Sequence, residues 1–246
     1  MGKYWIMKKS YLKIHPLTVF FLFLAFITGY FKYIIYFMSL IFIHEIGHVT
    51  AALFCNWHVK KVILLPFGGM TVFEEQVNTP IREEFFVVVA GPLYQHLFYL
   101  LLCLLGYQTS LLTTIHLFLL GFNLLPIYPL DGSKLFLLFF EKCLPFYHSQ
   151  IAITYLSCLT IGFFCFFPYN ILLLILLFFL SFHVCQFYKK IPFLFQKFIL
   201  ERKLYSFSFS RKKTISQVKE MKRDYEHYFI KNGRVYREKE YLHKNF

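Results

Sequence analysis

The sequence predicts an all-α polytopic membrane protein, and three of its properties carry that prediction. Of the 246 residues, 58% are hydrophobic and 22% are aromatic. The mean hydropathy of +0.54 lies far above that of an ordinary soluble domain. The apolar residues also gather into runs that are long enough to cross about 30 Å of hydrocarbon, which takes roughly 20 helical residues.

About six transmembrane helices are expected from these runs. They cover residues 16–31, 33–54, 85–106, 111–130, 150–166 and 168–188. The first run is expected to stay in the protein as a span, because no small-residue cleavage site follows it and Lys32 leads straight into the next run. We therefore expect a membrane domain at 1–188, a linker at 189–205 and a basic tail at 206–246.

The net charge of +13 is explained by the way the chain crosses the membrane. With six spans, the N-terminus, the loops at 55–84 and 131–149 and the C-terminal residues 189–246 share one side, and they hold 25 of the 26 Lys and Arg residues. Positively charged loops stay in the cytosol, so both termini are expected there. The distribution of charge therefore predicts that the protein interacts with the lipid bilayer and makes no direct contact with nucleic acid.

The sequence His44-Glu45-Ile46-Gly47-His48 interrupts an apolar stretch. On a helix, positions i and i+4 share one face, so both imidazoles can bind one metal ion while Glu45 reaches a metal-bound water. The pattern is short enough to arise by chance in a soluble protein. Within a span, however, each ionisable residue costs about 2.5 to 3.5 kcal/mol and is usually functional. The motif therefore predicts a zinc-dependent hydrolase with one Zn²⁺ per chain.

A catalytic zinc takes three protein ligands and leaves one position for water, so a third ligand is needed. Asp131 is the only acidic residue between Glu84 and Glu141, and it lies in the segment 123–132, Asn-Leu-Leu-Pro-Ile-Tyr-Pro-Leu-Asp-Gly. The two prolines break the helix, and irregular backbone at membrane depth is tolerated where protein or a wet cavity surrounds it. Asp131 is therefore expected to be the third ligand, with a helix-stop residue in a turn as the alternative.

Four further polar residues in the predicted spans have more than one interpretation. Asn123 precedes Asp131 on the disrupted helix, where its amide is placed to donate to a developing oxyanion or to hold substrate backbone. A helix-packing role explains Asn123 almost equally well. His96, His116 and His183 are each a fourth ligand, a proton relay or, as is more usual, a hydrogen-bond partner of a neighbouring helix.

The segment 59–73 predicts a short β-hairpin or re-entrant element, because apolar β-branched residues flank a Pro-Phe-Gly-Gly turn. An exposed edge at Phe67, Gly68 and Gly69 would pair with an extended substrate by strand addition. A protease needs such a template, because a helical peptide hides its carbonyls in its own hydrogen bonds. A structural turn between two spans is the alternative.

The His44–His48 motif, followed by Asp131 in its Pro- and Gly-containing segment, resembles the site-2 protease family of intramembrane zinc metalloproteases. The likeness runs from about residue 12 to the tail. It implies that His44, His48 and Asp131 bind zinc and that Glu45 is the catalytic base. The protein would then be an intramembrane zinc endopeptidase that cleaves a membrane-associated protein near the cytosolic face.

Within that family, the segments 61–69 and 90–92 and the basic tail are similar to the sporulation proteases of endospore-forming bacteria. This likeness implies that the substrate is pro-sigma-K, the precursor of a sporulation sigma factor. It also implies inhibition by two membrane proteins that resemble stage IV sporulation protein FA and bypass-of-forespore protein A. The expected location is the forespore outer membrane, facing the mother cell.

The tail at 206–246 predicts a small cytosolic α/β element. The residues 214–218, a helix-like run to Tyr225 and an apolar strand up to Val235 resemble one abbreviated cystathionine-beta-synthase (CBS) motif. In relatives this module binds nucleotide, so the resemblance implies ATP binding. A basic tail held on anionic lipid, at about 1 kcal/mol per surface Lys or Arg, explains the composition equally well.

Two other functions remain open from the sequence. A membrane ion carrier also uses intramembrane His, Glu and Asp residues, but transport needs no general base beside two imidazoles. An inactive binding homologue would keep the fold and lack a ligand or the base, yet none of these residues is missing here. The sequence leaves the oligomeric state undetermined, a homo-oligomer included.

Overall fold

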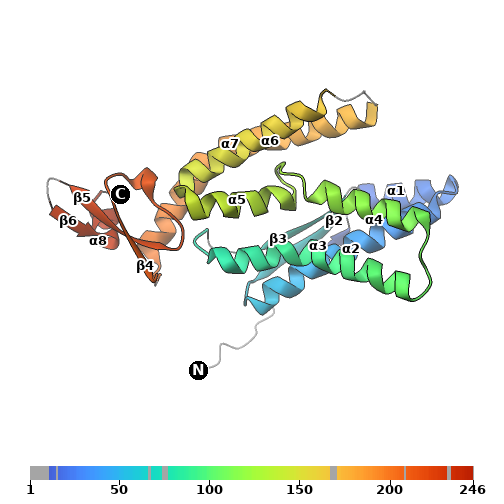
Figure 1. Cartoon of the computed structure of the whole chain (residues 1–246), viewed down its shortest axis with the longest axis horizontal. Coiled ribbons are helices and arrows are strands. Elements are labelled where there is room, and N and C mark those ends of the chain that lie inside the picture. The colour runs from blue at the N-terminus through green and yellow to red at the C-terminus, as the bar shows by residue number, and fades with distance from the viewer. Residues whose placement is uncertain are drawn as a thin grey trace. The chain divides into compact units, whose positions relative to one another are not determined.

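A computed structural model (Figure 1) describes residues 11–14, 16–65, 68–73, 77–166, 171–207, 209–231 and 234–245. The described chain is mostly helical, as the sequence predicts, and holds two small three-stranded sheets. It packs as two units. The first unit comprises Met1–Glu75 and Phe86–Asn123, and the second comprises Gln76–Phe85 and Leu124–Phe246.

Helix α2 is the centre of the first unit. The helices of this unit are α1 (Pro16–Ile27), α2 (Phe31–Phe54), α4 (Ser110–Asn123) and most of α3 (Ile81–Leu104). Leu40 and Ile41 of α2 are buried against Leu112 and Leu119 of α4. The two α4 leucines are seven residues apart, which places them on one face of the helix. This apolar stripe holds α4 against the middle of α2.

Small residues allow α2 and α3 to approach each other closely. A Cβ built on Gly47 would lie only 2.5 Å from the backbone oxygen of Ala90. Ala51 and Ala52 of α2 are buried with Val87 and Ala90 one turn along the same contact. Without bulky side chains between them, the two backbones pack directly, as is common for helices in membranes.

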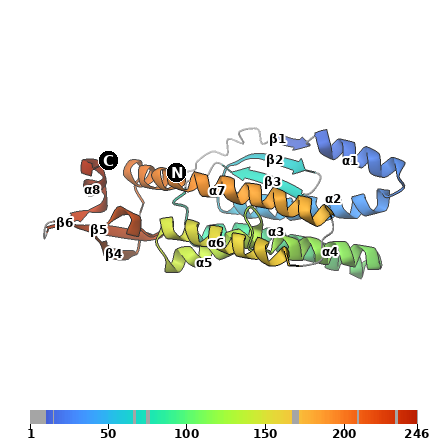
Figure 2. The same ribbon diagram turned by 90° about the horizontal axis from the view of Figure 1, so that it is seen from above.

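The predicted hairpin is present in the first unit. Strand β2 (Val59–Leu65) pairs antiparallel with β3 (Gly68–Phe73), and Leu65 lies opposite Gly68. A third strand, β1 (Tyr11–Ile14), adds parallel to β2 and was not predicted, because four residues show no periodicity of their own. The sheet order is therefore β1-β2-β3, and β3 lies beside α2 (Figure 2).

The second unit is built on two long antiparallel helices and a short one. They are α5 (Asp131–Cys143), α6 (Phe146–Phe164) and α7 (Ile171–Leu204), and α6 and α7 run side by side (Figures 1 and 2). Ile153 of α6 is buried against Phe187 and Ile191 of α7. Residues 189–204, assigned to a linker by the sequence analysis, continue α7 as helix. Phe198 and Ile199 of this stretch are buried in one cluster with Phe146 of α6.

The tail forms the α/β element that the sequence predicts. Its elements are β4 (Arg211–Ile215), the 3₁₀-helix η1 (Val218–Glu220), β5 (Tyr225–Lys231), β6 (Arg234–Arg237) and α8 (Glu238–Asn245). Strand β5 pairs parallel with β4 and antiparallel with β6. The helix-like run expected before Tyr225 is reduced to η1. Met221, Phe229 and Leu242 are buried together with Phe198 of α7, so the tail shares a core with the end of that helix.

Among the described residues, three helices are long and apolar enough to cross a membrane. They are Phe31–Phe54, Ile81–Leu104 and Leu173–Leu204, and Ser110–Asn123 is a shorter apolar helix. These helices agree with a membrane protein of this size. The count of six spans and the division into membrane domain, linker and tail stay predictions.

Candidate metal centre

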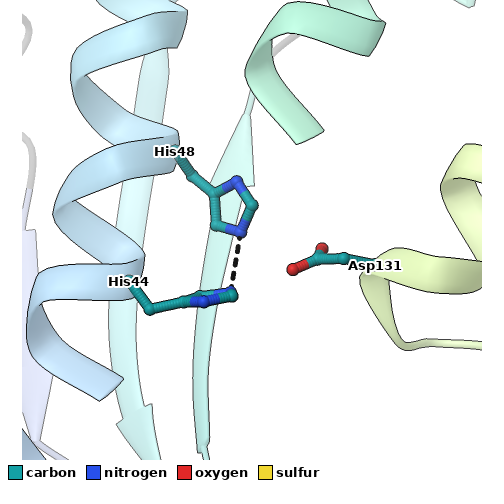
Figure 3. A group of neighbouring side chains, drawn as sticks. All are labelled: His44, His48 and Asp131. Carbon is teal, nitrogen blue, oxygen red and sulfur yellow. Dashed lines mark hydrogen bonds between the residues drawn. The ribbon is translucent and has the colours of Figure 1, made fainter. Parts of the chain in front are cut away.

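His44 and His48 lie on one face of α2, as the i and i+4 spacing requires (Figure 3). Both side chains are buried, with 4% and 6% of their surface exposed. The planes of the two rings are nearly perpendicular, and the ring centroids lie 4.7 Å apart. The two Nε2 atoms face each other at a distance of 3.1 Å. Two imidazoles therefore point their distal nitrogens at one spot inside the protein.

The opposite nitrogen of each ring is held by a carbonyl oxygen. His48 Nδ1 lies 2.8 Å from the backbone oxygen of Val87, and His44 Nδ1 lies 3.1 Å from Oε1 of Gln95. A carbonyl oxygen accepts hydrogen bonds and donates none, so both Nδ1 atoms carry the proton. In the neutral rings the two facing Nε2 atoms then carry lone pairs. Lone pairs at this distance repel unless a cation lies between them.

The spacing of the two nitrogens fits zinc. Nitrogen ligands lie about 2.0 to 2.1 Å from a tetrahedral zinc, which puts two of them about 3.3 Å apart. The observed separation of 3.1 Å is close to that value. Donation of Nδ1–H to a carbonyl is also the usual arrangement of histidines that bind metals, because it fixes the tautomer and the ring orientation.

Gly91 of α3 brings backbone directly against both rings. A Cβ built on Gly91 would lie 2.3 Å from Nε2 of His48 and 2.9 Å from Nε2 of His44. Any side chain at this position would therefore enter the space that the two nitrogens face. The steric role of Gly91 depends on the approach of α3 to α2 and leaves no signal in the sequence.

Asp131 begins α5, directly after the helix break that its two prolines predict. Helix α4 ends at Asn123, and the peptide between Tyr128 and Pro129 is cis. A Cβ on Gly132 would lie 2.1 Å from the backbone oxygen of Leu124, so this glycine lets the segment fold back on itself. The Asp131 carboxylate is buried and accepts a hydrogen bond from Lys134 Nζ at 3.1 Å.

His44, His48 and Asp131 form one group of side chains (Figure 3). Each offers one ligand atom, and these atoms all lie within 4.8 Å of one another. All three residues are buried. Two imidazoles and a carboxylate are a donor set that zinc favours in hydrolases. No other group of this kind occurs in the described ranges of the chain.

The side chain of Glu45 contacts strand β3. Its Oε2 accepts a hydrogen bond from Thr71 Oγ1 of β3 at 2.6 Å. A Cβ on Gly69 would lie 2.2 Å from Cγ of Glu45, so the bare backbone of β3 passes directly over this side chain. Of the residues predicted to contact a substrate strand, Gly68 and Gly69 open β3, and Phe67 lies outside the described residues. Thr71 was not predicted, because a threonine in a strand carries no signal of its own.

The remaining candidates are Asn123 and three histidines outside the His-His-Asp group. Asn123 is half-buried at the last residue of α4. Nδ1 of His96 lies 3.2 Å from Nε2 of His116, which links α3 to α4 as expected for helix-packing histidines. His183 of α7 lies against the ring of Phe179, with ring centroids 4.5 Å apart. None of these three histidines belongs to the His-His-Asp group found among the described residues.

Comparisons with known proteins agree with this chemistry. The model of peptidase family M50 matches residues 32–111. Stage IV sporulation protein FB of Bacillus subtilis (strain 168) is 36% identical over 202 residues, which cover 77% of this chain and 70% of that protein. A zinc metalloprotease of Methanocaldococcus jannaschii is 30% identical over 113 residues, which cover 42% of this chain and 32% of that protein.

The fold also has a solved counterpart. The site-2 protease from Methanocaldococcus jannaschii matches with a TM-score of 0.54 and 23% identity, over 71% of this chain and 89% of its own. That likeness shows a shared fold. The identity to the sporulation protein extends over most of both chains. The residues that the family model matches include the His-Glu-x-x-His helix. The chain therefore belongs to the site-2 protease family, peptidase family M50, of zinc metalloproteases.

Proposed function

We propose that this protein is an intramembrane zinc endopeptidase that cleaves a membrane-associated protein near the cytosolic face. His44, His48 and Asp131 hold the zinc, and Glu45 is the catalytic base. The observation that supports this most strongly is the pair of Nε2 lone pairs that face each other at 3.1 Å, with both Nδ1 atoms engaged by carbonyl oxygens. An ion carrier needs no such fixed pair beside a base, so this observation favours the hydrolase.

When bound, zinc activates a water molecule and polarises the carbonyl of the scissile bond. Glu45 takes the proton of the attacking water and returns it to the leaving nitrogen. Thr71 already donates to Oε2 of Glu45, so Oε1 is the oxygen that accepts the proton. The missing side chain at Gly69 leaves room beside that oxygen. Asn123 donates to the oxyanion that forms on the substrate carbonyl.

Strand β3 is the template for the substrate in this proposal. The order β1-β2-β3 leaves one side of β3 without a partner strand among the described residues. An extended peptide that adds along Gly68 and Gly69 would present its carbonyls to Glu45, since β3 passes over that side chain. Phe67 would contact the substrate at the turn.

The relationship to the sporulation protein supports sporulation as the setting. We propose pro-sigma-K as the substrate, as the resemblance in the sequence implies. We propose the forespore outer membrane as the location, with both termini in the cytosol. The inhibitors would resemble stage IV sporulation protein FA and bypass-of-forespore protein A. ATP binding by the abbreviated CBS-like tail stays a prediction, which equilibrium dialysis of the purified protein against ATP would test.

Co-expression with the pro-sigma-K candidate of the same organism tests the reaction and the substrate together. Wild-type protein should shorten the precursor, Glu45→Gln should leave it intact, and both should purify with about one zinc per chain. Glu240→Gln, an exposed residue of α8, is the matched control and should cleave normally.

The outcomes separate the parts of this proposal. Cleavage by Glu45→Gln would refute the role of Glu45. Zinc-loaded wild-type protein that leaves the precursor intact would refute the substrate and keep the metal centre. Undiminished zinc in Asp131→Ala would remove that carboxylate from the ligand set.

A further inference from the structure

A buried chain of polar side chains leads from the metal centre into the contact between α3 and α4, all within the first unit. Its members are His44, Gln95 and His116, of which Gln95 and His116 are each 1% exposed. Burying an amide among apolar helices is unfavourable unless its hydrogen bonds are made. Gln95 is thus held by its partners on both sides, and those partners define how its amide is turned.

The orientation of the Gln95 amide follows from its contact with α4. Nε2 of Gln95 lies 3.3 Å from the backbone oxygen of His116 and 3.3 Å from Nδ1 of the same residue. A backbone oxygen only accepts, so the NH₂ group must face α4. The carbonyl oxygen of Gln95 consequently faces His44 and accepts the proton of Nδ1. The flip of an amide is usually ambiguous, and here a backbone group resolves it.

His116 is itself fixed in one tautomer by the same reasoning. Its Nδ1 accepts from Gln95, so Nε2 carries the proton and donates to Nδ1 of His96 at 3.2 Å. The His116 ring is stacked on Tyr99 at 4.2 Å between centroids, with the planes 1° apart. The Tyr99 hydroxyl in turn lies 3.1 Å from Oγ1 of Thr113. Donors and acceptors thus match along the whole chain.

We propose that Gln95 is a positioning residue for the metal centre, and that His116 holds it in place. Gln95 keeps the proton of His44 on Nδ1, which leaves the lone pair of Nε2 directed at the metal. The inference rests on the proposed zinc ligands and goes beyond them, because it assigns a function to two residues outside the ligand set. Loss of such a partner typically weakens metal binding by about 10-fold to 100-fold.

The two ligand histidines differ in a way that makes the proposal testable. His48 is held by the backbone oxygen of Val87, which no substitution removes. His44 is held by a side chain, which a substitution can remove. Gln95→Leu removes both the acceptor for His44 and the donor to α4. Gln95→Glu keeps an acceptor for His44 and loses the donor to His116.

The experiment measures zinc affinity by competition with a chelator, using the full chain in detergent and zinc as the only ligand. Gln95→Leu should bind zinc about 10-fold to 100-fold more weakly than wild type, and Gln95→Glu should recover most of that loss. The visible spectrum of the Co²⁺-substituted protein should change in Gln95→Leu, because the His44 ring is no longer held. Gln186→Leu, an exposed glutamine of α7, is the matched control.

Three results would overturn the inference, and the third would also refute the proposed zinc ligands. Wild-type affinity in Gln95→Leu would show that His44 needs no partner. Equal losses in Gln95→Leu and Gln95→Glu would show a purely structural role, since the acceptor alone would rescue nothing. Wild-type protein that binds no zinc at all would refute the proposed ligand set, and the inference would fail with it.

Discussion

Gly91 is a residue at which the addition of a single methyl group would contact both histidines of the candidate metal centre. Its missing side chain leaves the space that the Nε2 atoms of His44 and His48 face. An added methyl would push the ends of two side chains rather than a backbone, so the helices can keep their packing while the rings turn away. The fold and the metal centre are therefore separable at this position.

We expect Gly91→Ala to fold and to lose activity. A displacement of about 1 Å at a reacting centre can cost roughly 100-fold in rate, and the ligand rings must move by at least that much. Zinc content by metal analysis and kcat/KM on the precursor measure the two effects. Gly121→Ala, where no atom lies within 4 Å of the new Cβ, should behave as wild type. Full zinc content and activity in Gly91→Ala would contradict the described approach of α3.

The sequence predicts the residues of the candidate site better than it predicts the residues that contact them. His44, Glu45, His48 and Asp131 carry chemistry in their side chains, so spacing and burial single them out. Thr71, Gln95 and Gly91 act through a hydroxyl, an amide or the absence of a side chain. Such residues are common in membrane helices and strands, and only their neighbours in space reveal what they do.

At the scale of the element, the tail contains a buried histidine whose protonation would disrupt its surroundings. Nε2 of His227 accepts from the backbone N–H of Lys222 at 3.0 Å, and Nδ1 lies 3.0 Å from a carboxylate oxygen of Glu238. The ring is fully buried, and burial lowers the pKa of His227 although the carboxylate favours its charged form. The charges of Arg202 and Lys213 act in the same direction as burial.

The tail should lose stability as the pH falls below about 6.5. The unfolded state takes up a proton on His227 near that pH and the folded state does not, so the stability is present above 6.5 and declines toward the lowered pKa. The pKa of Glu238 is also lowered, since the hydrogen bond from His227 and the charge of Arg202 outweigh burial, so its contribution declines below the ordinary value of 4.5. Hydrogen exchange of β5 amides at pH 7.5 and pH 5.5 measures the change.

His227→Gln provides the comparison for this prediction. Its amide can accept from Lys222 and donate to Glu238 without titrating. Glu141 of α5, whose pKa burial raises to about 7, acts in the opposite direction between about 4.5 and 7, but it is present in both proteins. The difference between wild type and His227→Gln therefore isolates the histidine. An equal loss of protection in both proteins would assign the acid effect to another group.

At the scale of the whole molecule, the distribution of Lys and Arg predicts which segments face the cytosol. With six spans, the connection around Thr109 lies opposite the tail around Ser210. We expect a cysteine at Thr109 to react with a membrane-impermeant maleimide added to intact cells, and a cysteine at Ser210 to react only after lysis. The native cysteines are replaced by serine in both variants. Labelling of both positions from one side would exclude the predicted topology.

The sequence by itself predicted the membrane class, the hairpin and the three residues of the His-His-Asp group, because each depends on local periodicity or on a rare residue in an apolar run. It also predicted that the helix is broken within residues 123–132, since two prolines three residues apart exclude a regular helix. Strand β1 and the helical course of residues 189–204 were decided by tertiary structure. The four residues of β1 form a strand because they pair with β2. Residues 189–204 mix apolar and charged side chains, and they stay helical because a core covers one face of the helix.

The tautomers of His44 and His48 belong to the tertiary structure alone. Spacing along the chain places both rings on one face, but it does not say which nitrogen of each carries the proton. That choice depends on acceptors that come from α3, about 40 and 50 residues away, and on the α4 backbone that turns the Gln95 amide. Hydrogen-bond partners distant in sequence leave no periodic signal, so the direction of the lone pairs is settled by packing.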